Sequence, residues 1–122
     1  MNSAIVDCAR GWLGTPYLHQ ASVRGAGCDC LGLLRGVWRE VYGSEPEAVP
    51  PYTPDWSEPQ GHEMLYQASL RHMRLATGDS PQPGHVVLFR MRDGAVAKHL
   101  GILSQVGSAP QIVHAYNGHG VV

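Results

Sequence analysis

The sequence lacks the features by which membrane, nucleic-acid-binding and secreted proteins are usually recognised. No apolar run approaches the roughly 20 residues that a bilayer-spanning helix needs, so we expect no membrane insertion. Nine Lys and Arg residues are balanced by ten Asp and Glu residues, which gives a net charge of −1 without any basic run. We therefore expect no nucleic-acid partner, because binding to phosphates needs a basic surface.

Cysteine is scarce, and the N-terminus does not resemble a secretion signal. The chain has three Cys in 122 residues, an odd number that does not suit a disulfide framework. Its first residues lack the basic and apolar regions of a signal peptide. We therefore expect synthesis in the cytoplasm with reduced thiols. Any action outside the cell would need a separate route of delivery.

Apolar residues at helical spacing predict two helices in the first third of the chain. One runs from Ile5 to Leu13 and is followed by glycine and proline. The other begins at Cys30, with Asp29 as its N-cap, and ends at Gly43. This second helix has the most continuous apolar face, so we expect it to be the buried central helix.

The middle of the chain is rich in proline and then returns to helical spacing. Between residues 44 and 60 there are five Pro, together with Tyr52 and Trp56. This composition predicts an ordered excursion that packs against the domain, because prolines oppose regular structure and aromatic residues favour packing. Apolar residues from about His62 to Ala76 then predict a further helix.

The last third of the chain has the two-residue period of β-strands. Strand-like runs, with a turn at 92–94, are expected at 85–89, 96–106 and 111–116. Helices followed by an antiparallel meander predict a single α+β domain over residues 1–122. The final residues, Gly120–Val122, resemble the start of another strand, which leaves open whether the domain lacks a C-terminal strand.

Two Cys lie where a glycine-rich loop turns into the predicted central helix. In the segment Gly27–Leu33, Cys28 and Cys30 are two residues apart. A helix start offers unpaired backbone N–H groups and a partial positive charge, and both favour a thiolate. A lone Cys is also commonly a small buried residue, so position alone leaves both roles open.

His99 and His114 are candidate partners for a thiol, because each lies between apolar residues of a strand-like run. If the two strands pair, the imidazoles can face the same side and meet. A Cys at a helix start, a base on one strand and an orienting residue on the next form the general arrangement of a Cys–His site. Core histidines with satisfied hydrogen bonds are the alternative. The loop at 14–29, with Tyr17 and His19, has the composition of loops that line sites.

These residues belong to a series of motifs that resembles the NlpC/P60 family of cell-wall cysteine peptidases. The motifs follow the order of that family over nearly the whole chain: Gly14–Tyr17, Gly27–Leu33, Pro83–Val86, Lys98–Ile102 and Val113–Ala115. Tyr17–Gly25 and the insertion at Pro50–Trp56 are similar to the phage-type branch, which is encoded among the tail genes of prophages and gene transfer agents.

The resemblance implies a papain-like α+β fold and hydrolysis of stem-peptide bonds in bacterial peptidoglycan, typically the γ-D-glutamyl to diamino-acid bond. It assigns Cys30 as the nucleophile, His99 as the base and His114 as the residue that orients the base. Three further residues are assigned to oxyanion or substrate binding: Tyr17, His19 and Asp29. No cofactor and no metal are implied. The chemistry needs Cys30 as a thiolate, and an imidazolium at His99 together with the helix N-terminus could lower its pKa.

Three positions depart from the usual motifs of the family. Leu31 stands where Ser is usual, His19-Gln20 where Gly-Gly is frequent, and His85 where Asp commonly follows Pro-Gly. The first two border the cleft. They therefore bear on substrate preference more than on the nucleophile.

The resemblance also implies partners and a location. We expect the chain to act on peptidoglycan stem peptides at the cell wall, in association with phage-like tail proteins or a virion. The absence of a signal peptide fits delivery by a tail as well as release at lysis.

Two other functions compete with a peptidase. A zinc module could use Cys28, Cys30 and either Cys8 or a His, although two thiols without a second pair make an incomplete structural site. A protein of the same fold could also bind the wall or help to assemble a tail without turnover.

Overall fold

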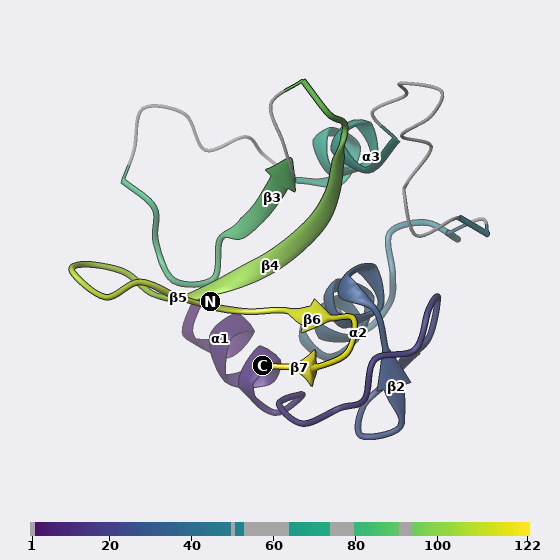
Figure 1. Ribbon diagram of the computed structural model, residues 1–122, viewed down its shortest axis with the longest axis horizontal. Helices are drawn as coiled ribbons and strands as arrows, with labels where there is room; N and C mark the ends of the chain where they lie inside the picture. Colours follow the sequence, from purple (N-terminus) through teal and green to yellow (C-terminus); the bar gives the residue numbers. More distant parts are fainter. Residues whose placement is uncertain (1, 50, 53–63, 74–79, 91–93) are drawn as a thin grey trace.

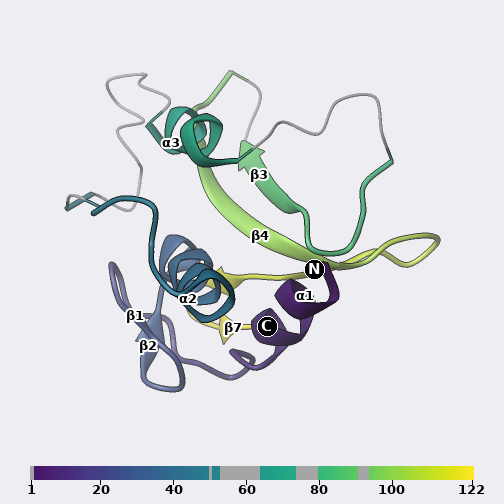
Figure 2. The same ribbon diagram turned by 180° about the vertical axis from the view of Figure 1, so that it is seen from behind.

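The computed structural model describes residues 2–49, 51–52, 64–73, 80–90 and 94–122. The helices are α1 (Asn2–Arg10), α2 (Cys30–Tyr42) and α3 (Met64–His72). The strands are β1 (Ser22–Val23), β2 (Gly27–Cys28), β3 (Val86–Arg90), β4 (Ala97–Gln105), β5 (Gln111–Val113), β6 (Ala115–Tyr116) and β7 (Gly120–Val121). In both views the long, curved β4 lies between α3 on one side and α1 and α2 on the other (Figures 1 and 2). Helices and antiparallel sheets thus form the α+β arrangement that the sequence predicts.

Helix α2 begins and ends at the predicted residues because both of its ends are capped. The Asp29 side chain accepts the Gly32 N–H at 2.7 Å and so satisfies one of the amides that a helix start leaves unpaired. At the other end, Gly43 has a φ of 92°, and its N–H donates to a carbonyl of the last turn. Leu33 and Val37 lie on the buried face, as expected for the central helix.

Helix α1 is shorter than its apolar spacing predicts. It ends at Arg10, and Leu13, which was expected to continue the apolar face, is 52% exposed. Trp12 is instead buried, and its ring packs against Gly36 of α2. The turn after Arg10 carries the indole to α2, where its burial removes a large apolar surface from water.

The main sheet has the order β3-β4-β5, with all pairs antiparallel. Phe89 pairs with His99, but the next residue, Arg90, pairs with Ala97. One extra residue, Lys98, therefore lies on β4 immediately before His99. Such a β-bulge bends the strand and changes the direction of the side chains beside it.

The run 111–116, predicted as one strand, divides at His114. Residues before it form β5, which pairs with β4, and residues after it form β6, which pairs with β7. The backbone of His114 exchanges two hydrogen bonds with Val122, of 3.1 and 3.0 Å. The final run thus forms a strand, as predicted, and that pairing draws the chain away from β4.

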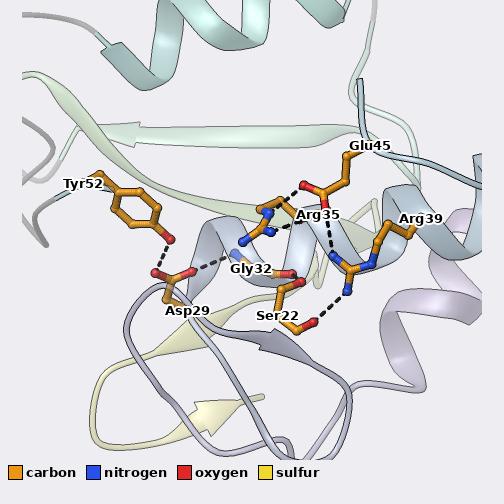
Figure 3. A network of polar contacts seen from close by, with 7 residues as sticks. All are labelled: Ser22, Asp29, Gly32, Arg35, Arg39, Glu45 and Tyr52. Carbon is orange, nitrogen blue, oxygen red and sulfur yellow. Dashed lines mark hydrogen bonds and ion pairs between the residues drawn. The ribbon is translucent and has the colours of Figure 1, made fainter. Parts of the chain in front are cut away.

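The proline-rich segment after α2 packs against the domain in the part that the structure describes. The Glu45 carboxylate accepts hydrogen bonds from Arg35 at 2.7 Å and from Arg39 at 3.0 Å, both on α2 (Figure 3). Tyr52 packs against the side chains around Cys30. The prediction of an ordered excursion is therefore confirmed for residues 44–49 and 51–52.

Several predictions fall outside the described residues. These are the excursion around Trp56, both ends of the 62–76 helix at His62 and Ala76, and the turn at residues 92–93. Helix α3 occupies the centre of the predicted 62–76 helix. In the part of the chain that the structure describes, no helix has the length and apolar character needed to cross a membrane.

Two groups of buried apolar side chains hold the elements together. The larger group consists of Ala9, Trp12, Cys28, Leu33, Val37, Ile102, Val113, Ala115 and Val121. The smaller group consists of Cys30, Leu65 and Leu100, which come from α2, α3 and β4. The candidate nucleophile therefore lies where three elements meet.

Gly36→Ala should lower the free energy of unfolding by about 1–3 kcal/mol. The added Cβ would lie 2.0 Å from a carbon of the Trp12 ring, so the ring would have to move. Urea unfolding followed by circular dichroism measures the loss. In a Trp12→Phe background the overlap is smaller, so the double variant should lose less than the sum of the single changes. Fully additive losses would contradict this account.

Candidate active site

Cys30 is the first residue of α2, and its side chain is only 6% exposed. Burial raises the pKa of the thiol to about 11, and the neighbouring Asp29 carboxylate also raises it. Backbone N–H groups of Leu100, Leu31 and Cys30 itself hydrogen-bond to the sulfur and oppose the rise. The effect of burial is the larger, so the thiol stays protonated at neutral pH.

Asp29 lies beside the thiol and is 2% exposed. Its Oδ1 accepts the Gly32 N–H, while its Oδ2 accepts the Gln20 N–H at 2.7 Å and the Tyr52 hydroxyl. Figure 3 shows Tyr52 and Gly32 reaching the carboxylate from different segments. We call these four residues the Asp29 network. Both oxygens of Asp29 accept hydrogen bonds from the protein. These contacts join the start of α2, the loop before it and the proline-rich segment.

His19 lies against the Asp29 network. Its Nε2 is 2.9 Å from the carbonyl oxygen of Tyr52, and a carbonyl can only accept, so Nε2 carries the proton. The two rings make an edge contact, with centroids 5.2 Å apart. The Nδ1 atom is 3.6 Å from Asp29 Oδ2 and, among the described residues, is buried without a hydrogen-bond partner. His19 therefore belongs to the same group of residues as the start of α2.

Tyr17 is half-buried and is held beside Cys28 by its neighbours in the chain. The Cys28 N–H donates to the Pro16 carbonyl, and the Leu18 N–H donates to the Cys28 carbonyl, both at 3.0 Å. Burial, and after it the Asp29 carboxylate, raises the pKa of the Tyr17 phenol. The hydroxyl is therefore protonated at neutral pH and can donate a hydrogen bond.

His99 and His114 meet, as expected if their strands pair. His99 Nε2 is 2.8 Å from His114 Nδ1, and the ring centroids are 5.1 Å apart. Between the strands, a Cβ at Gly101 would lie 3.2 Å from the Cβ of His114. Glycine at this position leaves room for the diagonal contact of the rings. The hydrogen bond occupies Nε2 of His99 and leaves its Nδ1 as the nitrogen that can act on a thiol.

Further rings surround the two imidazoles. Phe89 lies 5.7 Å from His99, and Tyr116 lies 5.7 Å from His114 and 6.1 Å from His99, as measured between ring centroids. Tyr116 also stacks on His119. None of these neighbours was a predicted site residue. Tyr116 could have been found, because it follows His114 by two residues, whereas the contact with Phe89 depends on a register that no local pattern shows.

Burial lowers the pKa of both imidazoles. For His99, burial and then the neighbouring His114 lower the pKa to about 4, and for His114 burial lowers the pKa. Both rings are therefore neutral at pH 7. The expected pair of a Cys30 thiolate with a His99 imidazolium is wrong for this conformation, because the pKa of the thiol lies far above that of the imidazole.

The predicted site residues form two groups. Around the start of α2 lie Tyr17, His19, Asp29 and Cys30, and on the sheet lie His99 and His114. Leu100 connects the groups, since it follows His99 on β4 and its N–H reaches the sulfur of Cys30. In the described part of the chain, no hydrogen bond joins Cys30 to either imidazole.

A cavity of about 150 Å³ lies between α2, the proline-rich segment and α3. Tyr52 and Leu65 line it and also pack against Cys30. Neither imidazole lines it. Cys30 does not line it either, so the cavity adjoins side chains that pack against the thiol and not the thiol itself.

The other two thiols are in less reactive surroundings. Cys28 is fully buried in the larger core, and burial raises its pKa to about 12. Cys8 donates to the Glu40 carboxylate at 2.5 Å, and burial raises its pKa to about 12 as well. Among the described residues, no group of three His, Cys, Asp or Glu side chains is arranged to hold a metal ion. The zinc alternative thus gains no geometric support.

The rate at which iodoacetamide alkylates Cys30 should rise about tenfold per pH unit between pH 7 and pH 10, because only the thiolate reacts and its pKa lies near 11. Mass spectrometry of the tryptic peptide 25–35 can locate the label on Cys30 or Cys28 by fragmentation. A rate that is already constant between pH 6 and pH 8 would show a preformed thiolate and contradict this assignment.

Comparison of the chain with protein-family models finds no match, and comparison with curated proteins finds none either.

Proposed function

We propose that this protein is a cysteine peptidase with the papain-like fold of the NlpC/P60 family, and that it hydrolyses stem-peptide bonds of bacterial peptidoglycan. The motif pattern favours the γ-D-glutamyl to diamino-acid bond. One structural observation carries the proposal. His99 and His114 are hydrogen-bonded to each other, and the residue after His99, Leu100, contacts the thiol of Cys30. A thiol, a base and an orienting residue thus come from neighbouring elements.

Because the thiol of Cys30 and the imidazole of His99 are both neutral, the first step must include proton transfer between them. His99 Nδ1 takes the proton of Cys30 as the sulfur forms a bond to the carbonyl carbon of the scissile amide. His114 keeps the ring of His99 oriented through the bond at Nε2. The backbone N–H of Cys30 and the hydroxyl of Tyr17 donate to the oxyanion. The His99 ring must move toward Cys30 for this step, since the two are not hydrogen-bonded in the structure.

The remaining steps return the site to its starting state. His99 gives its proton to the leaving amine as the C–N bond breaks, which leaves a thioester on Cys30. A water molecule then attacks the thioester carbonyl, and His99 accepts its proton. The C–S bond breaks, the sulfur regains a proton, and the new carboxylate leaves. No step needs a cofactor or a metal.

A second candidate function has one observation in its favour. Cys30 is nearly buried and its pKa is raised, which are also properties of an unreactive core thiol. This favours a protein of the same fold that binds the wall or helps to assemble a tail. The hydrogen-bonded imidazoles favour the peptidase, because a binding protein would not need them.

The proposed place of action is the cell wall, as part of a phage-like tail or virion. Its support is the similarity of Tyr17–Gly25 and Pro50–Trp56 to the phage-type branch. Stem peptides and tail proteins are the proposed partners.

Cys30→Ala should lower the release of muropeptides from purified peptidoglycan by roughly 10⁴-fold or more, because the thiol forms the covalent intermediate. Mass analysis of the soluble products measures the release and identifies the bond. Cys28→Ala is the matched control and should keep activity within a few-fold. Full activity in Cys30→Ala, or loss only in Cys28→Ala, would refute the assignment.

His114→Ala should lower kcat by about 10–100-fold, because the base loses the hydrogen bond that orients it. His114→Asn retains a group that can accept a hydrogen bond and should keep more of the activity than His114→Ala. Equal activity of the wild type and His114→Ala would remove His114 from the site.

A further inference from the structure

We propose that Tyr52 is a positioning residue of this site: its hydroxyl holds Asp29, and through Asp29 it holds the start of α2 and the loop at 17–21 in the arrangement that Cys30 needs in order to react. The inference rests on the proposed role of Cys30 as the nucleophile. It adds a residue from the proline-rich segment, which carries none of the motif residues assigned to catalysis.

Tyr52 binds two segments at once. Its hydroxyl donates to Asp29 Oδ2 at the start of α2, while its backbone carbonyl accepts from His19 Nε2 at 2.9 Å and from Gln20 Nε2 at 2.7 Å. Its ring packs against the group of side chains around Cys30. Burial, and after it the bond to Asp29, raises the pKa of the phenol, so the hydroxyl remains a donor over the working pH range.

The loop that Tyr52 and Asp29 hold is strained and closely packed. Gln20 has a φ of 67°, which a residue with a side chain adopts only when its surroundings fix it, and its N–H donates to Asp29. A Cβ at Gly32 would lie 1.8 Å from the carbonyl oxygen of Ala21, so the loop lies directly against the first turn of α2. A shift of the Asp29 carboxylate would therefore disturb both the loop and the helix start.

The segment that carries Tyr52 is fixed at its other end as well. Glu45 is bound by Arg35 and Arg39 of α2, and Arg39 also donates to the Ser22 carbonyl at 2.7 Å (Figure 3). These ion pairs are partly buried, and Arg35 binds both oxygens of the Glu45 carboxylate. Ion pairs of this geometry contribute more to stability than exposed single contacts do. The start of this segment is therefore held against α2, the helix whose N-cap residue Tyr52 contacts.

The groups that face Cys30 predict whether loss of the Tyr52 hydroxyl raises or lowers the thiolate fraction of Cys30. Its titratable neighbours are Asp29 and Cys28 beside it, Tyr17 on the loop and Tyr52 on the proline-rich segment. Asp29 raises the pKa of the thiol, and the Tyr52 hydroxyl is one of three donors that neutralise this carboxylate. Without that hydroxyl the charge is less neutralised and the N–H groups of the helix start are less well held. Both changes reduce the thiolate fraction.

Tyr52→Phe removes the hydroxyl and keeps the ring. Cys30 of this variant should react with iodoacetamide about threefold more slowly than the wild type at every pH from 7 to 9, which corresponds to an upward shift of about half a pH unit in the profile. Tyr42→Phe, at the exposed end of α2, is the matched control and should leave the rate unchanged. Equal or faster labelling of Tyr52→Phe overturns the proposal. A merely loosened structure would expose the thiol and speed the reaction, so it cannot imitate the expected slowing.

Asp29→Asn tests whether the effect passes through the carboxylate, because Asn keeps an N-cap acceptor but carries no charge. In this background Tyr52→Phe should change the labelling rate by less than about 1.5-fold, and a persistent threefold change overturns the route through Asp29. Labelling needs no substrate. If the wild type releases no muropeptides the proposed function fails, yet the comparison of labelling rates still shows whether Tyr52 acts on Cys30.

Discussion

The burial of one carboxylate, that of Asp29, constrains the whole region around Cys30. A buried charge is costly unless hydrogen bonds satisfy it, and here the donors come from Gly32, Gln20 and Tyr52. These residues belong to the first turn of α2, to the loop before it and to the proline-rich segment after it. Satisfying a single charge therefore brings three segments together. The same charge raises the pKa of the thiol, so the carboxylate that holds these segments together also opposes ionisation of the proposed nucleophile, Cys30.

A protonated, covered thiol has a chemical advantage in the resting protein. Oxidants and alkylating agents react with the thiolate, so a Cys30 with a pKa near 11 is protected from them. His99 is also uncharged, because burial lowers its pKa to about 4. A neutral imidazole could accept the proton of Cys30 only in contact with the thiol. In the proposed mechanism, proton transfer from Cys30 and attack by its sulfur would then be coupled to the same movement.

Features set by local interactions could be predicted from the sequence, and features set by distant contacts could not. The ends of α2 follow from Asp29 and Gly43, which act within one turn of the helix. The meeting of His99 and His114 follows from alternation along paired strands. The packing of Trp12 after the end of α1, by contrast, depends on the space that Gly36 leaves for its ring, and the division at His114 depends on pairing with Val122.

The same distinction applies within the candidate site. Tyr52 could be recognised as an aromatic residue that packs, but its contact with Asp29 spans 23 residues of sequence and has no local signature. The position of Cys30 relative to β4 is likewise set by packing between α2, α3 and the sheet. Motif order named the residues, and only the three-dimensional arrangement shows that the thiol and the imidazoles form two groups connected at Leu100.

The pairing of β7 affects the order in which these groups can form during synthesis. Val121 exchanges hydrogen bonds with Gly14 and Thr15, just before Tyr17, while Val122 pairs with the backbone of His114. Val121 and Val122 thus touch the segments that carry both groups. Because a ribosome makes the chain from its N-terminus, Cys30 emerges long before residues 120–122 can join these segments. The arrangement is completed only after residues 120–122 have been made, so until then a nascent chain carries the thiol without its finished surroundings.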